Sequence, residues 1–177
     1  VNGFRKLALV TNTANSRDGG VLTTADFLET IKLMGVGGVN ADKNKTAFII
    51  NSAVHYKALE LTDVKSRDIF GGATIENGFL SGIYGIPIYV SHQMHKAATT
   101  RLALASGKVD GATPTNGTTG SILAVRWDQW RFGYKRRMTI ESTRIPAADS
   151  TEIVALMRFG LINRDTESSA ITYNLTV

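Results

Sequence analysis

The sequence predicts an α+β fold in which a central sheet and a few helices are followed by long antiparallel strands. First, the apolar run at residues 46–50 leads directly into a capped helical pattern, which is typical of a strand followed by a helix. Second, β-branched residues alternate with others at residues 86–91. Third, apolar and polar residues alternate near the end of the chain over stretches longer than the usual strand of about five or six residues.

The composition is that of a globular protein with room for one large or two small domains. The chain has 177 residues, of which 43% are hydrophobic and 20% are charged. Its formal charge of +5 permits contact with nucleic acid without requiring it. No apolar run is long enough to span a bilayer, so we expect no membrane partner. The chain starts with Val1 rather than Met, from which we expect a removed leader or a piece of a longer protein.

Two helices are predicted in the first half of the chain. The first covers residues 24–34, with Thr23 or Thr24 as its N-cap and Gly35 as the residue that ends it. Its apolar face consists of Phe27, Leu28, Ile31 and Met34. The second follows the strand at 46–50 and is capped by Asn51 or Ser52. Its apolar face consists of Val54, Ala58 and Leu61.

The stretch at residues 79–94 contains a glycine-proline corner that leads into the strand at 86–91. Pro87 cannot donate a backbone hydrogen bond, so it should lie among the first residues of that strand or on a sheet edge. We expect Gly85, just before this strand, to adopt a positive φ that is closed to other residues. A later segment, 106–120, is rich in glycine and threonine and is expected to be a mobile loop or a contact tip.

Three strands are predicted in the last third, at 130–141, 151–162 and 170–177, with a turn at Asp149 and Ser150. At about 3.3 Å per residue, the first two strands form a ribbon of roughly 35–40 Å. Five apolar residues share one face of the first strand, and we expect this face to be buried under another layer: Trp130, Phe132, Tyr134, Met138 and Ile140. A ribbon of this length is more typical of an assembling protein than of a compact enzyme.

The residues that could carry catalysis match no reactive pattern closely. His92 and His95 are the nearest approach to a metal pair, but Gln93 stands where a zinc protease has Glu, and the spacing is too short. Lys108 follows a glycine, but Val109 replaces the Ser or Thr of a phosphate-binding loop. No Gly-x-Ser-x-Gly motif is present, and the chain has no cysteine. We therefore predict no catalytic, cofactor-binding or metal-binding residues and no enzymatic activity, with a hydrolase or metal enzyme at the two histidines as the weakest alternative.

A basic cluster at residues 126–144, in and beside the first long strand, carries a second alternative. It consists of Arg126, Arg131, Lys135, Arg136, Arg137 and Arg144. One interpretation is a nucleic-acid-binding domain that uses strand 126–144 to face phosphates. The other, which the interleaved apolar residues favour, is an exposed strand whose charges prevent edge pairing and form salt bridges to a neighbouring subunit.

The order of the motifs resembles the C-terminal half of the major capsid proteins of tailed bacteriophages, the family typified by phage Hong Kong 97, which includes encapsulin shells. The resemblance rests on four segments: TAFIINSAVHYKAL at 46–59, GIPIYVS at 85–91, the basic strand at 131–137, and Arg-Phe-Gly at 158–160. It covers residues 24–177. The N-terminal arm, extended hairpin and long helix of the family have no counterpart, so we expect a fragment or a trimmed form.

The resemblance implies an axial-type domain at 24–120 with a central sheet and helices, and a peripheral-type domain at 121–177 with long strands. Residues 1–23 would be an N-terminal remnant or linker. It further implies a structural protein of a phage or prophage that assembles into an icosahedral head enclosing DNA. The implied partners are copies of the chain in pentamers and hexamers, scaffolding and portal proteins, and packaged DNA by non-specific contact, without a small-molecule substrate. The implied location is the virion, after assembly in the cytoplasm of the host bacterium.

Overall fold

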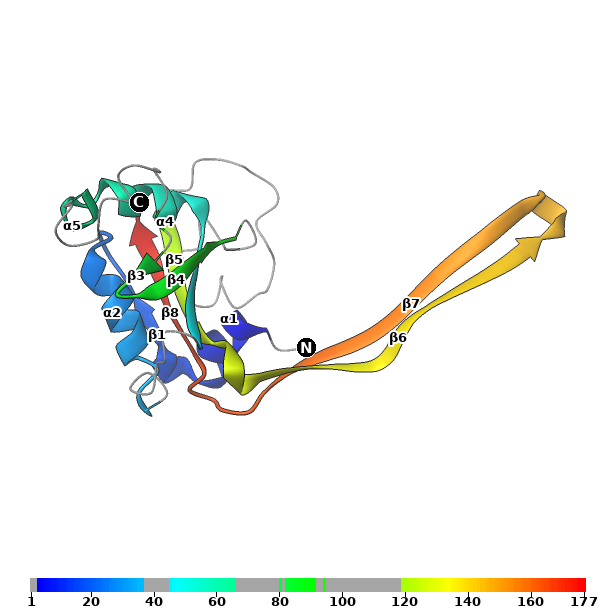
Figure 1. Ribbon diagram of the computed structural model, residues 1–177, viewed down its shortest axis with the longest axis horizontal. Coiled ribbons are helices and arrows are strands. Elements are labelled where there is room, and N and C mark those ends of the chain that lie inside the picture. The colour runs from blue at the N-terminus through cyan, green and yellow to red at the C-terminus, as the bar shows by residue number, and fades with distance from the viewer. Residues whose placement is uncertain (1–2, 37–44, 66–79, 81, 92–93, 95–118) are drawn as a thin grey trace.

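The protein consists of a globular body and a long two-stranded ribbon that projects from it (Figure 1). This computed structural model describes residues 3–36, 45–65, 80, 82–91, 94 and 119–177. His92, His95 and Lys108, and most of the loop predicted at 106–120, lie outside the described residues. No helix in the described part of the chain is both long and apolar enough to cross a membrane.

A six-stranded mixed sheet forms the centre of the body. Strand β5 pairs antiparallel with β2 on one side and with β8 on the other, while β4 runs parallel to β2 and β1 runs parallel to β8. The strand order is β1 (Ser16–Asp18), β8 (Ser169–Thr176), β5 (Thr119–Arg126), β2 (Thr46–Ile50), β4 (Ile86–Val90) and β3 (Gly82–Ile83). The sheet thus contains strands from both sides of residue 120, and the division into domains at that residue stays a prediction.

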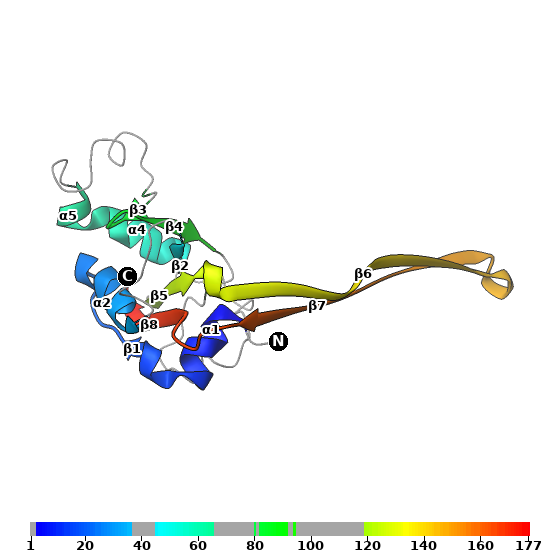
Figure 2. The same ribbon diagram turned by 60° about the horizontal axis from the view of Figure 1, so that its bottom comes forward.

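Helices α2 (Thr24–Lys32), α4 (Ser52–Glu60) and α5 (Thr62–Lys65) lie against one face of this sheet, as the turned view in Figure 2 shows. The cap of α2 joins Thr23 to Asp26, whose Oδ2 accepts the Thr23 backbone N–H at 2.8 Å. The Oδ1 of Asn51 accepts the Val54 N–H at 2.9 Å and caps α4. Both predicted helices are therefore confirmed, and their predicted apolar residues lie in or against the main core with one exception. That core includes Phe27, Met34, Phe48, Ile50, Val54, Ala58 and Ile122. Leu28, predicted on the apolar face of the first helix, is 42% exposed, so that placement is wrong.

The opposite face of the sheet is covered in part by the N-terminal segment. Helix α1 (Phe4–Lys6) continues into a wide helical turn, Leu7–Thr11, in which Leu7 and Leu9 are fully buried. Phe4 meets Trp130 edge to face, with ring centroids 4.6 Å apart. A second core forms here from Leu7, Ala8, Leu9, Met94, Leu123, Val125, Trp130 and Ile171. Much of the predicted N-terminal segment at 1–23 is thus packed onto the body.

The corner before β4 has the predicted geometry. Gly85 has a φ of 74°, and Tyr84 beside it has a φ of 52°. Pro87 is the second residue of β4, which agrees with its predicted place at the start of the strand. Gly82 lies opposite Pro87, and a Cβ on Gly82 would approach the Ile86 carbonyl oxygen to 2.8 Å. Glycine is therefore required at this position as well, because the two strands lie too close for a side chain.

The ribbon consists of β6 (Trp130–Ile145) and β7 (Ser150–Asn163), joined by a turn at Pro146–Ala148 and Asp149. The predicted long strands and their turn are confirmed. The register shifts twice: Tyr134 faces Phe159 and Thr139 faces Leu156, so five steps along β6 match three along β7. Strand β6 therefore contains two extra residues, which form bulges between Tyr134 and Thr139.

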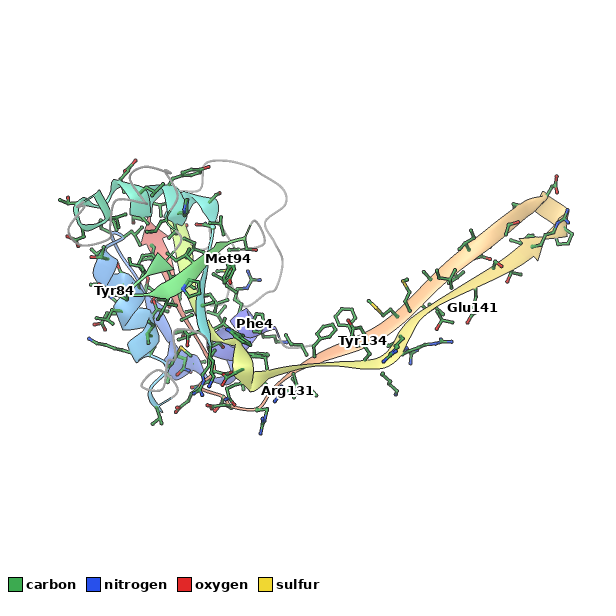
Figure 3. All side chains as sticks on the ribbon, viewed as in Figure 1. Phe4, Tyr84, Met94, Arg131, Tyr134 and Glu141 are labelled. Atoms are coloured by element: carbon green, nitrogen blue, oxygen red, sulfur yellow. The ribbon has the colours of Figure 1, made fainter. Side chains whose placement is uncertain are left out.

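The prediction that the apolar face of the first long strand, now β6, is buried is wrong for the single chain. Trp130, next to the body, is 7% exposed, but Phe132, Tyr134, Met138 and Ile140 are 52–65% exposed. The physical reason is that a ribbon of two strands has no second layer of its own, and no described residue of the body reaches it beyond its base (Figure 3). Alternation identifies residues that share a face, but it does not supply the surface that covers them.

Candidate functional site

His55 is the one histidine among the described residues, and its surroundings are those of a structural group. It lies in α4 and is 5% exposed. The Nε2 atom accepts a hydrogen bond from the Leu80 N–H at 3.4 Å, which joins α4 to the segment before β3. Burial lowers the pKa of His55, which favours the neutral ring. Within the described ranges, no three His, Cys, Asp or Glu residues are grouped as a metal site would require.

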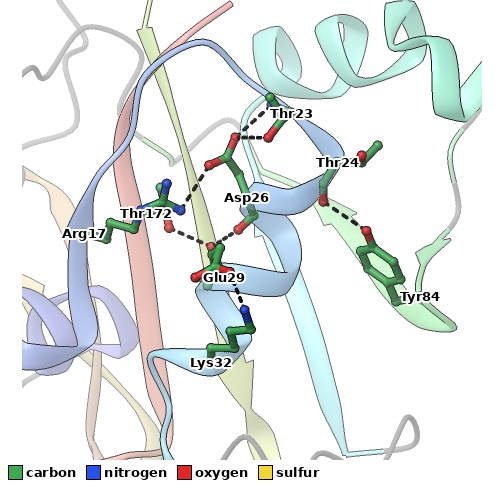
Figure 4. A network of polar contacts seen from close by, with 9 residues as sticks. Arg17, Thr23, Thr24, Asp26, Glu29, Lys32, Tyr84 and Thr172 are labelled. Atoms are coloured by element: carbon green, nitrogen blue, oxygen red, sulfur yellow. Dashed lines mark hydrogen bonds and ion pairs between the residues drawn. The ribbon is translucent and has the colours of Figure 1, made fainter.

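A partly buried polar network joins the edge of the sheet to α2 (Figure 4). Arg17 Nη1 lies 3.1 Å from Asp26 Oδ1, and Asp26 Oδ2 also accepts the Thr23 hydroxyl at 2.8 Å. The Thr30 and Thr172 hydroxyls are 2.7 Å apart and connect α2 to β8. These contacts satisfy the polar groups of α2 where it packs on the sheet, which indicates a structural role.

An apolar groove of about 790 Å³ lies on the sheet face opposite the three helices. Its walls come from β2, β4 and β5, together with Phe4 of α1 and Trp127 of the turn that follows β5. The described lining residues are Phe4, Ala47, Ile49, Gly85, Pro87, Tyr89, Ser91, Val125 and Trp127. They include no carboxylate, amine or imidazole, so this lining offers shape and apolar surface rather than acid–base chemistry. Sequence reasoning missed the groove because its residues come from four separate segments.

The ribbon is the other candidate, and one of its faces is aromatic. The Phe132 ring stacks on Phe159 at a centroid distance of 5.1 Å and meets Tyr134 edge to face at 4.9 Å. Each of the three side chains is at least 50% exposed. Exposed apolar patches of this kind mark interaction surfaces in soluble proteins. The sequence indicated the β6 members, but Phe159 could be added only once the pairing of β6 with β7 was known.

The charges of the ribbon are divided along its length. The half next to the body carries Arg131, Lys135, Arg136, Arg137 and Arg158 and no acidic residue. The outer half carries Arg144 with Glu141, Asp149 and Glu152. The structure therefore places most of the predicted basic cluster on the ribbon, adds Arg158 to it, and separates it from Arg126, which pairs with Asp128 at 2.9 Å on the body.

Comparisons with known proteins identify the fold. No protein-family model matches the chain, and no curated protein matches it in sequence. The capsid of the cyanophage P-SCSP1u matches at 13% identity over 98% of this chain and 61% of that chain, with a TM-score of 0.60. The mature capsid of bacteriophage PhiM1 matches at 11% identity over 89% of this chain and 51% of that chain, with a TM-score of 0.63.

A third structure extends the likeness beyond phages. The SrpI encapsulin complex of Synechococcus elongatus matches at 12% identity over 94% of this chain and 56% of that chain, with a TM-score of 0.55. The chain thus has the fold of Hong Kong 97-type capsid proteins, as the order of its motifs predicted. It spans between about half and three-fifths of the length of these structures' chains.

Proposed function

We propose that this chain is a major capsid protein, or a part of one, that assembles with its own copies into the icosahedral head of a phage or prophage. The observation that supports this most is the ribbon, because its aromatic face is exposed to solvent in the single chain. An isolated two-stranded ribbon is marginally stable in water. Neighbouring copies would supply the missing layer, and the capsid-type fold supports the same conclusion.

In this proposal, residues 24–120 form an axial-type region and residues 121–177 a peripheral-type region, with residues 1–23 leading into them. The partners are copies of the chain in pentamers and hexamers, scaffolding and portal proteins during assembly, and enclosed DNA by non-specific contact. The head would be assembled in the cytoplasm of the host bacterium and the protein would remain in the virion. The proposed role is structural, without catalysis, a cofactor or a small-molecule substrate.

Self-association of the purified chain tests the proposal. We expect sedimentation velocity to show larger species as concentration rises, and electron microscopy of these species to show rings or closed particles. The matched control replaces Phe132, Tyr134 and Phe159 by Ser, which should weaken association and leave the unfolding transition of the body in place. A wild-type chain that stays monomeric at every concentration would contradict the proposal.

Nucleic-acid binding by the basic ribbon is the second candidate. The inner half of the ribbon carries five basic residues and no acidic one, which favours it. If the ribbon binds phosphates, the logarithm of the affinity for duplex DNA should fall linearly with the logarithm of salt concentration, with a slope of roughly −0.9 for each phosphate neutralised. Fluorescence anisotropy with labelled DNA measures this slope. Replacing Lys135 and Arg137 by Gln should make the slope less steep, whereas an unchanged slope would exclude the ribbon as the DNA contact.

A further inference from the structure

The ribbon has a second face, opposite the aromatic one. Directly paired residues of an antiparallel ribbon share a face, and every second pair lies on the same face. Counting from the pair Arg136–Arg158, this face also carries Arg131–Ile162, Gly133–Gly160, Thr139–Leu156, Glu141–Val154 and Thr143–Glu152. We call it the arginine face.

Charge on the arginine face changes sign between the body and the tip. Arg131, Arg136 and Arg158 lie toward the body, and Glu141 and Glu152 lie toward the tip. Two arginines directly opposite each other destabilise a ribbon that stands alone. Among the described residues, Arg131, Arg158 and Glu152 form no ion pair, and Arg136 reaches Glu141 only at 3.4 Å with both side chains about half exposed.

A surface that is positive at one end and negative at the other complements itself when a copy is reversed end to end. Leu156 lies midway between Arg158 and Val154 along β7, and it is 41% exposed. Consider a twofold axis that passes Leu156, lies between the two docked faces and is perpendicular to the strands. This axis places Arg136 of each copy over Glu141 of the other. The same rotation places Glu152 over the pair Gly133–Gly160, where a Cβ on either glycine would meet no atom within 4 Å.

We propose that two copies of this chain dock through their arginine faces, antiparallel and about a twofold axis at Leu156. The docking exchanges the weak internal Arg136–Glu141 pair of each copy for two reciprocal pairs between copies. It brings each Glu152 between Arg131 and Arg158 of the other copy, so charges that have no partner in the single chain gain one. This inference specifies one contact of the self-association proposed above and rests on it.

Cross-linking tests the twofold axis, because the chain contains no cysteine. With Leu156→Cys, a short bismaleimide that spans the roughly 10 Å between packed sheets should join two copies, since a residue on the axis meets itself. The matched control is Ala155→Cys, the neighbouring residue on the aromatic face, which should give no such product. Cross-linking of Ala155→Cys in place of Leu156→Cys, or cross-linking that requires added duplex DNA, would overturn the proposal.

Charge reversal tests the ion pairs in the Leu156→Cys background. Arg136→Glu alone and Glu141→Arg alone should each lower the yield of cross-linked dimer about tenfold, because each places like charges over one another twice. A mixture of the two single variants should restore the yield, with intact masses showing the mixed dimer, because every pair between the unlike copies is then complementary. Restoration in the mixture cannot arise within one chain, and it also shows that both variants are folded.

The outcomes separate this contact from the proposed function. If the wild-type chain self-associates by sedimentation but Leu156→Cys is not cross-linked, or if the mixture does not recover, the arginine-face contact is wrong and the shell function stands. If no species larger than a monomer forms in any sample, both fail.

Discussion

Single residues of this chain show how backbone geometry limits what the sequence can contain. Gly85 has a φ of 74°, a region that a β-branched residue enters only at a cost of roughly 1–2 kcal/mol. We therefore expect Gly85→Val to lower the free energy of unfolding by about that amount and to reduce soluble yield. Urea titration followed by circular dichroism measures the free energy of unfolding. Gly20→Val is the control, since Gly20 is not at positive φ and has open space around its Cβ position, and an equal loss in both variants would contradict the argument.

His55 gives the chain a pH dependence of predictable sign. Burial lowers its pKa in the folded state, so the unfolded chain takes up the proton at higher pH than the folded chain does. The stability contributed by neutral His55 is complete above the unfolded pKa of about 6.5 and is lost as pH falls toward the folded pKa. We expect the free energy of unfolding to decrease with acidification more steeply in the wild type than in His55→Gln. Equal slopes in the two proteins would show that His55 is not responsible.

At the scale of elements, the body and the ribbon should respond differently to loss of an aromatic ring. Phe48 of β2 is fully buried, and its ring meets that of Phe27 in α2 with the centroids 5.3 Å apart. We therefore expect Phe48→Ala to lower the free energy of unfolding by about 3–5 kcal/mol. Phe132 is 52% exposed, so Phe132→Ala removes mainly the contacts of its ring with neighbouring rings. We expect it to lower the free energy of unfolding of the monomer by about 1 kcal/mol or less. Thermal unfolding at low protein concentration measures both. A large loss for Phe132→Ala in the monomer would mean that the ribbon face is covered within the chain.

At the scale of the whole molecule, hydrogen exchange should divide the chain into two parts. Strand β5 is paired on both sides in the centre of the sheet, whereas β6 and β7 pair only with each other. Amides of the outer ribbon should therefore exchange much faster than those of β5 in the monomer, and should slow down on assembly. Slow amide exchange along the ribbon in the monomer would show that the ribbon is stable without contact to another copy. The same experiment tests the prediction that residues 106–120 form a mobile loop or a contact tip, because such a segment should gain protection only on assembly.

The sequence by itself determined the local elements of this protein. Caps such as Asn51 and the helical spacing of apolar residues located α2 and α4, because these signals act within one or two turns of a helix. The apolar run at 46–50 located β2, and period-two alternation located β4 and the long strands. The place of Gly85 before β4 predicted its positive φ. The order of these elements was sufficient to predict the fold class and the capsid-type fold.

Only the tertiary structure decided what these elements face. Strand β1 was not predicted, because its partner β8 lies about 150 positions away and a three-residue strand carries no period of its own. The two bulges of β6 place Arg136 opposite Arg158, which no alternation within β6 could indicate. Phe132, Tyr134 and Ile140 have the pattern of a buried strand and yet are exposed. The pattern records which residues share a face, and whether that face meets solvent, the body or another copy depends on surfaces outside the segment.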